Sequence, residues 1–278
     1  MPDDWSRYWR SPDLPLEAMY AHFERHVYHR HSHEGYSFGV TEDGAQAFSC
    51  RGAGHTSATG MVMAFNPDDP HDGHAADELG FTYRIIHIGP ELVASVLAEM
   101  TGGPAGLPLF AEPVHRDPVL ARDLSALHRA LLGGASALRR DELLTAAIAS
   151  MVRRAAIGPG PRAVRTARAG ASAAERARQL LHDFPAADFS ASQLATAAGC
   201  SRFALHRAFT ARYGMTPGDY QRQLRLRAAR RLIAQGSSIS AAAAQAGFAD
   251  QSHLTRWFGR YYGITPGGYR SAAQRMAG

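Results

Sequence analysis

The chain has 278 residues, 45% of them hydrophobic, and a formal net charge of +5. This is enough for two ordinary hydrophobic cores, and its two cysteines, one in each half, support neither a disulfide framework nor a cysteine zinc cluster. No stretch approaches the ~18 apolar residues of a membrane span, and no apolar run follows the acidic start, so we expect a soluble, cytoplasmic protein.

The amino-terminal region, about residues 15 to 110, predicts short strands joined by tight turns. Apolar and polar side chains alternate over 36–41 and 81–88, as they do in half-buried strands. Turns rich in Gly, Asp and Pro, such as 66–70, separate these runs. The pattern indicates a small all-β barrel.

Histidines occur in this region at a spacing that suits a metal. His31 and His33 lie two apart on a strand and share a face, and His71 could supply a third ligand. His31-Ser32-His33, with Gly60 and Pro67 to His71, resembles the paired motifs of cupin barrels. Metal-binding cupins usually add a Glu a few residues after the second His, but 35–38 reads Gly-Tyr-Ser-Phe. A divalent metal at these three histidines and a structural or ligand-contacting role without metal are both open.

Two helices are predicted next. Asp117 and Pro118 form an N-cap and first helical position, and Ser136 begins the second helix. A leucine stripe follows the first cap at helical spacing: Leu120, Leu124, Leu127 and Leu131. The stripe either forms a dimer seam or covers the barrel. Residues 157–172 are rich in Gly, Pro, Ala and Arg, which is typical of a mobile basic linker.

The last part of the chain repeats one motif. Nine residues between Leu205 and Tyr220 recur forty-nine positions later, between Leu254 and Tyr269. Each copy predicts a short helix, a turn opened by Gly, and a longer amphipathic helix ended by a second Gly. Helical repeat arrays need about three or more units to bury a continuous core, so two copies favour a pair of helix-turn-helix units.

Charge separates the two halves of the chain. From residue 157 onward there are 17 Arg and 5 acidic residues, whereas residues 1–156 contain 13 Arg and 20 acidic residues. The carboxy-terminal half therefore has the charge of a protein that binds a polyanion, and the amino-terminal half does not. Thr216-Pro217 predicts the start of a connecting helix over 217–235, roughly 28 Å long at about 1.5 Å per residue and close to the ~34 Å of one DNA turn.

The run from Gly247 to Phe258, followed by Gly263-Ile264-Thr265-Pro266 and Tyr269, resembles the signature of AraC/XylS transcription regulators. The resemblance covers about the last hundred residues, with a weaker likeness in the amino-terminal half. It implies a seven-helix DNA-binding module, whose two longer helices enter successive major-groove segments, and a cupin-like sensing domain. The partners implied are a double-stranded DNA operator, a small-molecule effector, RNA polymerase for an activator, and a homodimer.

The resemblance also implies which residues contact DNA. The family's base-contacting positions fall on Arg202, Phe203, His206, Arg207, Gln251, Ser252, His253, Thr255 and Arg256. Arg207 and Arg256 suit a bidentate contact to guanine, and Gln251 suits adenine. The alternative is that either Arg instead pairs with a phosphate or an acidic neighbour.

The effector is expected in the amino-terminal barrel, at residues that mix aromatic rings with polar groups, as ligand pockets do. These are His31, His33, Tyr36, Phe38, His71, Tyr83 and Arg84. Alternation does not tell whether Ser37 or Phe38, or Tyr83 or Arg84, faces inward, so only some of them can line one cavity. The acidic balance of this half favours a small, neutral or singly charged effector.

We therefore predict an α+β protein with four parts: a cupin-like sensing domain over 1–115, a helical linker over 116–156 that is a candidate dimerisation segment, a flexible linker over 157–172, and a double helix-turn-helix domain over 173–278. It is expected to be a ligand-responsive regulator, not an enzyme, and to require no cofactor. Two rival classes are a cupin metalloenzyme fused to a DNA-binding module and an alkylation-repair sensor. The missing Glu argues against the first, and the two isolated cysteines argue against the second.

Overall fold

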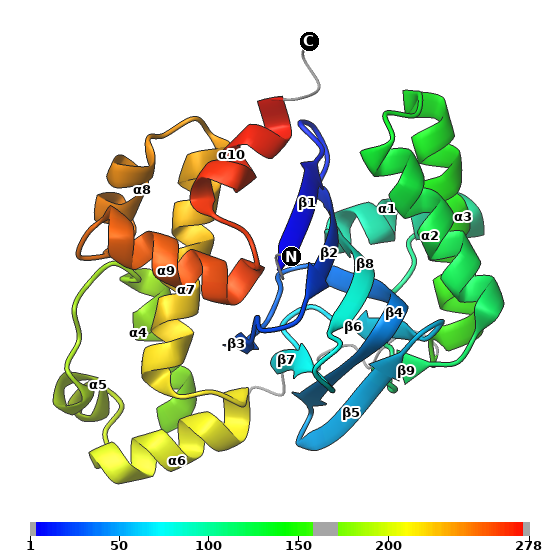
Figure 1. Ribbon diagram of the computed structural model, residues 1–278. Helices are drawn as coiled ribbons and strands as arrows, with labels where there is room; N and C mark the ends of the chain where they lie inside the picture. The colour runs from blue at the N-terminus through cyan, green and yellow to red at the C-terminus, as the bar shows by residue number, and fades with distance from the viewer. Residues whose placement is uncertain (1–3, 158–171, 275–278) are drawn as a thin grey trace. The chain divides into compact units, whose positions relative to one another are not determined.

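The computed structural model describes residues 4–157 and 172–274, which form two compact units (Figure 1). The amino-terminal unit is built mainly of strands, and the carboxy-terminal unit is built mainly of helices. The predicted linker, 157–172, lies outside the described residues except at its two ends. No helix in the described ranges is long and apolar enough to cross a membrane.

An antiparallel sheet forms the amino-terminal unit, as predicted. Its strands are β1 (Trp5–Arg10), β2 (Leu16–Phe23), β4 (Tyr36–Cys50), β5 (Ala53–Ala58), β6 (Val62–Phe65), β7 (His71–Ala75), β8 (Phe81–Ile88) and β9 (Val114–His115). The short strand β3 (Tyr28–His31) is grouped with the other unit. The main sheet has the order β1-β2-β8-β4-β6-β9. β4 is long enough to leave this sheet halfway and pair with β5 and β7. A shift in register between Thr41 and Asp43 marks the bend.

Two elements of this unit were not predicted. β1 lies before the region in which strands were expected, and helix α1 (Pro90–Thr101) lies within that region. Pro90 at the first helical position was a usable signal, but Gly89 provides no side-chain cap. α1 instead gains its stability from burying Val93, Val96 and Leu97.

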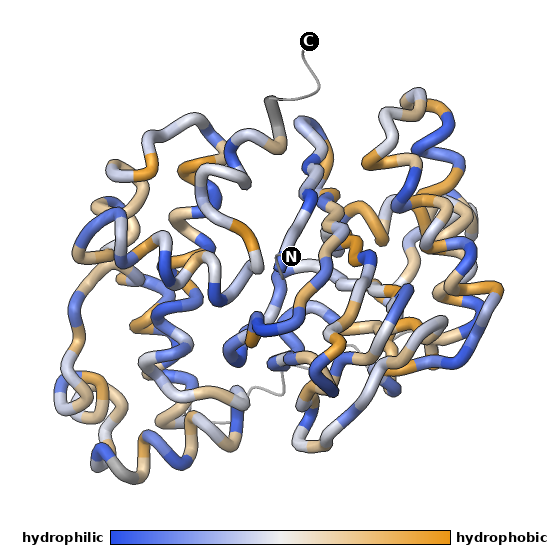
Figure 2. The backbone as a smooth tube through the Cα atoms, viewed as in Figure 1, coloured by the Kyte–Doolittle hydropathy of each residue, from blue (hydrophilic) through white to orange (hydrophobic). Residues whose placement is uncertain are grey.

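Helix α2 (Pro118–Leu132) packs against one face of the sheet, and α3 (Ala137–Ala155) packs against α2 and α1 (Figure 1). Their predicted caps are present, since the Asp117 side chain accepts from two backbone N–H groups and that of Ser136 accepts from one. Apolar and polar positions alternate along both helices (Figure 2). The leucine stripe of α2 is fully buried in one cluster with Ile86 and Ile88 of the sheet, so its leucines cover the sheet within this chain.

The carboxy-terminal unit contains the helices predicted from the repeat. They are α4 (Ala173–Asp183), α5 (Ala191–Ala197), α6 (Arg202–Tyr213), α7 (Pro217–Ala234), α8 (Ile239–Gln245), α9 (Gln251–Tyr262) and α10 (Pro266–Gln274). Ser190 with Gln193 forms a complete capping box, and Ser201 caps α6. Gly214 and Gly263 end α6 and α9 in the left-handed conformation, which a residue without a side chain adopts most easily. α7 connects the two helix pairs.

Candidate functional site

The longer helix of the first pair, α6, has a buried face and an exposed face. Leu205 and Phe209 lie in a core shared with α4, α5 and α7. Arg202, His206 and Arg207 are exposed on the other side. The side-chain surroundings of Phe203 lie outside the described part of the structure. α6 therefore presents three of its four predicted DNA-contacting side chains to solvent.

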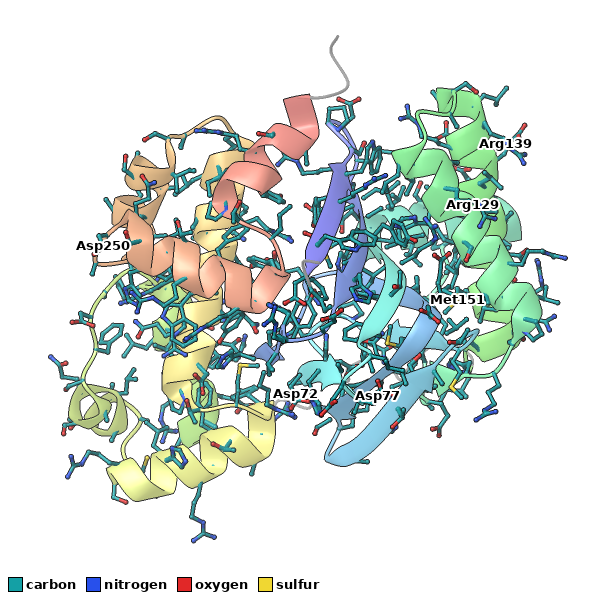
Figure 3. All side chains as sticks on the ribbon, in the orientation of Figure 1. Asp72, Asp77, Arg129, Arg139, Met151 and Asp250 are labelled. Atoms are coloured by element: carbon teal, nitrogen blue, oxygen red, sulfur yellow. The ribbon has the colours of Figure 1, made fainter. Side chains whose placement is uncertain are left out.

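α9 repeats this arrangement in the second pair. Asp250, labelled in Figure 3, caps the helix by accepting from the His253 backbone N–H at 2.6 Å. Leu254 and Phe258 are fully buried, whereas the predicted contacts Gln251, Ser252 and Arg256 are exposed. The other two predicted contacts, His253 and Thr255, are half-buried, and the His253 ring packs against Phe248 with centroids 5.5 Å apart.

One alternative to base contact by Arg207 and Arg256 was that either side chain pairs with an acidic neighbour in the chain. Within the described ranges Arg256 makes no hydrogen bond or ion pair, so its guanidinium is available to a ligand. Arg207 does interact with another group of the chain, but its side chain is exposed to solvent.

The arginines of α7 mostly serve the fold. Arg222 pairs with Asp219 at 2.6 Å and lies 3.8 Å from the centre of the Trp257 ring. Arg227 is buried, and Arg230 lies over the Tyr262 ring. The contacts with Trp257 and Tyr262 join α7 to α9, so they fix the second recognition helix against the connecting helix.

In the amino-terminal unit, sheet register settles which side chains share a face. Ser37 pairs with His87 across β4 and β8, and the Ser37 hydroxyl lies 2.8 Å from Nδ1 of His87. The His87 ring packs against His33 with centroids 4.4 Å apart, and His33 lies 5.2 Å from His71. His87 was not predicted, although the alternation of β8 with Tyr83 and Ile85 could have indicated it. Ser37 was named only as the alternative to Phe38.

The opposite face carries Tyr36, Phe38 and Arg84, whereas Tyr83 shares the face of His87 on β8. Tyr36 and Phe38 pack against Phe110 in the core beneath the helices. The Tyr36 hydroxyl donates to the Pro108 carbonyl oxygen at 2.8 Å, and burial raises the pKa of Tyr36 to about 12. Arg84 follows Tyr83 on β8 and therefore points to this same helix-covered side. Tyr36, Phe38 and Arg84 are thus not brought together with the histidines.

The three histidines predicted as metal ligands do lie together. One ring nitrogen from each of His31, His33 and His71 lies within 4.8 Å of the others. Nδ1 of His31 lies 2.6 Å from the His29 carbonyl oxygen, and Nδ1 of His71 lies 2.9 Å from that of Asp69. Since a carbonyl oxygen only accepts, Nδ1 carries a proton in both His31 and His71, which leaves Nε2 as the atom that could bind a metal ion. These residues could hold a metal ion or accept from a ligand's donor group.

A series of polar side chains, Glu42, Arg84 and His128, links the sheet to α2. Glu42, at the bend of β4, pairs with Arg84, whose guanidinium lies 4.0 Å from the Tyr20 ring centre. Arg84 also lies 3.2 Å from Nδ1 of His128, whose Nε2 lies 2.9 Å from the Met19 carbonyl oxygen. The guanidinium only donates and the carbonyl only accepts, so His128 is neutral with its proton on Nε2.

Burial lowers the pKa of His128 to about 4, from 6.5. The unfolded chain therefore binds more protons than the folded chain between these values, and stability falls as the pH falls through this window. Between pH 7 and pH 5 we expect a loss of about 2 kcal/mol from this residue. His128→Gln, which can keep both hydrogen bonds, should remove that part of the pH dependence in urea unfolding. An unchanged difference between the two pH values would contradict this assignment.

An open cleft of about 620 Å³ lies elsewhere in the amino-terminal unit. It is lined by Glu24, Arg25, His26, Val27, His74, Ala75, Asp77 and Glu78, and Figure 3 labels Asp77. None of the predicted ligand residues lines it. The cleft carries more acidic than basic side chains and has no aromatic ring other than its two histidines.

Comparison with known proteins agrees with this two-part arrangement. Residues 13–148 match the family described as an AraC-like ligand binding domain, and residues 194–272 match a helix-turn-helix domain. The uncharacterized HTH-type transcriptional regulator YbfI of Bacillus subtilis is 28% identical over 249 residues, or 87% of each protein. The transcriptional activator NphR of Rhodococcus is 40% identical over 99 residues, covering 35% of this chain but only 28% of that protein.

Among solved structures, wild-type ToxT from Vibrio cholerae with a bound unsaturated fatty acid has a similar fold. The TM-score is 0.53 at 11% identity, and the match covers 99% of this chain and 97% of that one. At this identity the similarity concerns the fold alone.

Proposed function

Because the chain belongs to the AraC family of transcription regulators, we propose that it reads operator DNA with α6 and α9 together, under the control of a small molecule held in the amino-terminal unit. The observation that carries the proposal is the duplicated, outward-facing recognition helix, with Arg207 on one copy and Arg256 on the other. Both helices belong to the half of the chain in which Arg exceeds acidic residues. We propose that the sensing domain spans 1–115, the helical segment 116–156, the linker 157–172 and the DNA-binding domain 173–278.

The proposed base contacts are the exposed side chains of the two helices. Arg207 and Arg256 are assigned to guanine, and Gln251 to adenine, because their paired polar atoms match the major-groove edges of those bases. Arg202, His206 and Ser252 lie beside them and contact flanking bases or phosphates. His253 and Thr255 are half-buried, so they contribute through shape and packing more than through hydrogen bonds.

The proposed effector site is centred on His33, His71 and His87, with Ser37 beneath them and His31 beside them. The support is that these rings contact one another on one face of the sheet, while the other face is filled by the core. Phe65 stacks on His71 with ring centres 4.0 Å apart and provides an apolar wall. A small, neutral or singly charged molecule with a hydrogen-bonding group and an apolar body suits this lining.

A divalent metal is the alternative occupant of the same site. Three imidazoles whose ring nitrogens lie within 4.8 Å of one another are a ligand set for zinc, cobalt or nickel, and a fourth ligand would have to come from His87 or solvent. We propose that operator binding itself needs no cofactor, because the recognition helices contain none of these residues. A metal would therefore act as the effector or as part of its site.

His33→Ala and His87→Ala are expected to reduce the response to the effector at least about tenfold, while operator affinity stays within about twofold, because neither residue lies in the DNA-binding unit. The matched control is His74→Ala, an exposed histidine that lies in the separate cleft. Thermal-shift screening with zinc, cobalt and a library of small carboxylic acids and alcohols identifies the probe, and fluorescence anisotropy on labelled operator measures the response. Both variants responding like wild type would place the sensor elsewhere.

We further propose that the chain carries no catalytic activity, that it functions in the cytoplasm as other chromosomal regulators do, and that it contacts RNA polymerase at promoters it activates. A homodimer is proposed from the family, but the leucine stripe of α2 does not form its seam, because that stripe is already buried. A metal-dependent cupin enzyme would instead show turnover that requires the three histidines.

A further inference from the structure

The segment between α4 and α5 is held by two side chains of the connecting helix. Gln221 and Arg225 lie four apart on α7 and so share one face. Gln221 Nε2 donates to the Ala187 carbonyl oxygen at 2.6 Å. Arg225 donates from Nε to the Pro185 carbonyl oxygen at 3.0 Å and from Nη2 to that of Ala187 at 2.8 Å.

Arg225 is committed to these carbonyl groups. Its side chain is 16% exposed, and the nearest carboxylate, that of Asp188, is 3.8 Å away and fully exposed, so it adds little. Burial lowers the pKa of Arg225, which is consistent with a guanidinium held mainly by carbonyl oxygens. Its planar fork fits two carbonyls at once, and Lys could not reproduce this geometry.

The turn of the second helix pair reaches the same segment. Gly247 lies between α8 and α9 with φ +83°, and a Cβ there would lie 2.7 Å from the Ala186 carbonyl oxygen and 3.1 Å from Nε of Arg225. The equivalent glycine of the first copy, Gly199, has one neighbour within 4 Å, the end of the Arg176 side chain at 3.4 Å. The repeat alone therefore does not explain why Gly247 is packed so closely.

These contacts join both helix pairs at one point. The segment 184–188 leads into α5 and hence α6, α7 carries the two donors, and Gly247 leads into α9. We propose that Gln221, Arg225 and Gly247 are positioning residues that fix α6 relative to α9, and thereby set the spacing of the two DNA elements that the chain accepts. The inference rests on the proposed reading of DNA by both helices.

The test measures affinity of the full-length chain for duplexes with the native operator spacing and with one or two base pairs inserted between the two elements. Each inserted pair moves the second element by about 3.4 Å and rotates it by roughly 35°. Wild type is expected to lose at least about tenfold with two inserted pairs. In Arg225→Met and Gln221→Leu this penalty should shrink at least threefold, because the helix pairs can then pivot about α7.

The matched control is Arg231→Ala, which removes an exposed Arg from the same helix and should keep the wild-type penalty. The ratio of two affinities from one preparation is independent of the fraction that is correctly folded. We call Gln221 and Arg225, with the carbonyl groups of 184–188 that they hold, the clamp. If Arg225→Met and Gln221→Leu keep the wild-type ratio, the positioning role is wrong, while the reading of DNA by two helices still stands. A wild-type chain that tolerates every spacing equally would instead refute two-helix reading, and the clamp with it.

Discussion

A fragment of residues 170–236 is expected to bind the operator roughly thirtyfold or more weakly than residues 170–278, because it lacks the contacts of Gln251 and Arg256, each worth about 1–3 kcal/mol. The longer fragment contains both recognition helices and α7, and it should bind about as tightly as the full chain without effector. The dependence on salt should also weaken in the shorter fragment, since phosphate contacts are lost.

Footprinting and anisotropy on one operator measure both effects. The shorter fragment exposes Ile233 and other buried positions of α7, so its helical content is checked by circular dichroism. As a control without truncation, Gln251→Ala combined with Arg256→Ala in the full chain should lose affinity to a similar degree. Equal affinity and an equal footprint for both fragments would contradict reading by α9.

Arg207→Ala and Arg256→Ala are each expected to lose about 1–3 kcal/mol of discrimination, at base positions about one helical turn apart. Alanine removes the fork that accepts only one base-edge pattern, so the variant should bind the native and the changed base almost equally. Affinities for duplexes with single base-pair changes measure this loss. Arg231→Ala, on the connecting helix, should leave discrimination at both positions unchanged.

The carboxy-terminal unit could be predicted almost entirely from sequence because its signals are local. Capping residues such as Ser190, Ser201 and Asp250 act within three residues of their own position, and the left-handed glycines end the helices that they follow. Comparison of the two copies of the repeat then indicated which residues of the two longer helices are exposed. α7 ends at Ala234, within one residue of the predicted end.

The amino-terminal unit was less accessible because its site depends on pairing between distant strands. The alternation of side chains along β8 predicted two faces, but it could not tell which face packs into the core. The register between β8 and β4 decides which face is buried. Once Ser37 is paired with His87, both the histidine cluster and the burial of Arg84 follow. The Glu42, Arg84 and His128 group joins residues far apart in the chain, and no local pattern marks it.

Helix α1 and the contacts of Gln221 and Arg225 with 184–188 could not be predicted from the sequence for a second reason, which is that both depend on tertiary packing. α1 forms where strands were expected, because burial of its apolar side outweighs the missing cap. Arg225 is one of several arginines on the connecting helix, and no local pattern distinguishes it from the others. Its carbonyl partners depend on a tertiary approach that also involves Gly247, and spacing in the sequence does not reveal it.

Selection of bound sequences from random duplexes by the full-length chain tests the central claim most directly. The account predicts a motif of two elements with centres about one helical turn, or roughly ten base pairs, apart. Arg207→Ala should erase information in one element only, and Arg256→Ala in the other. A single short element that both variants leave unchanged would contradict reading by two helices of one chain.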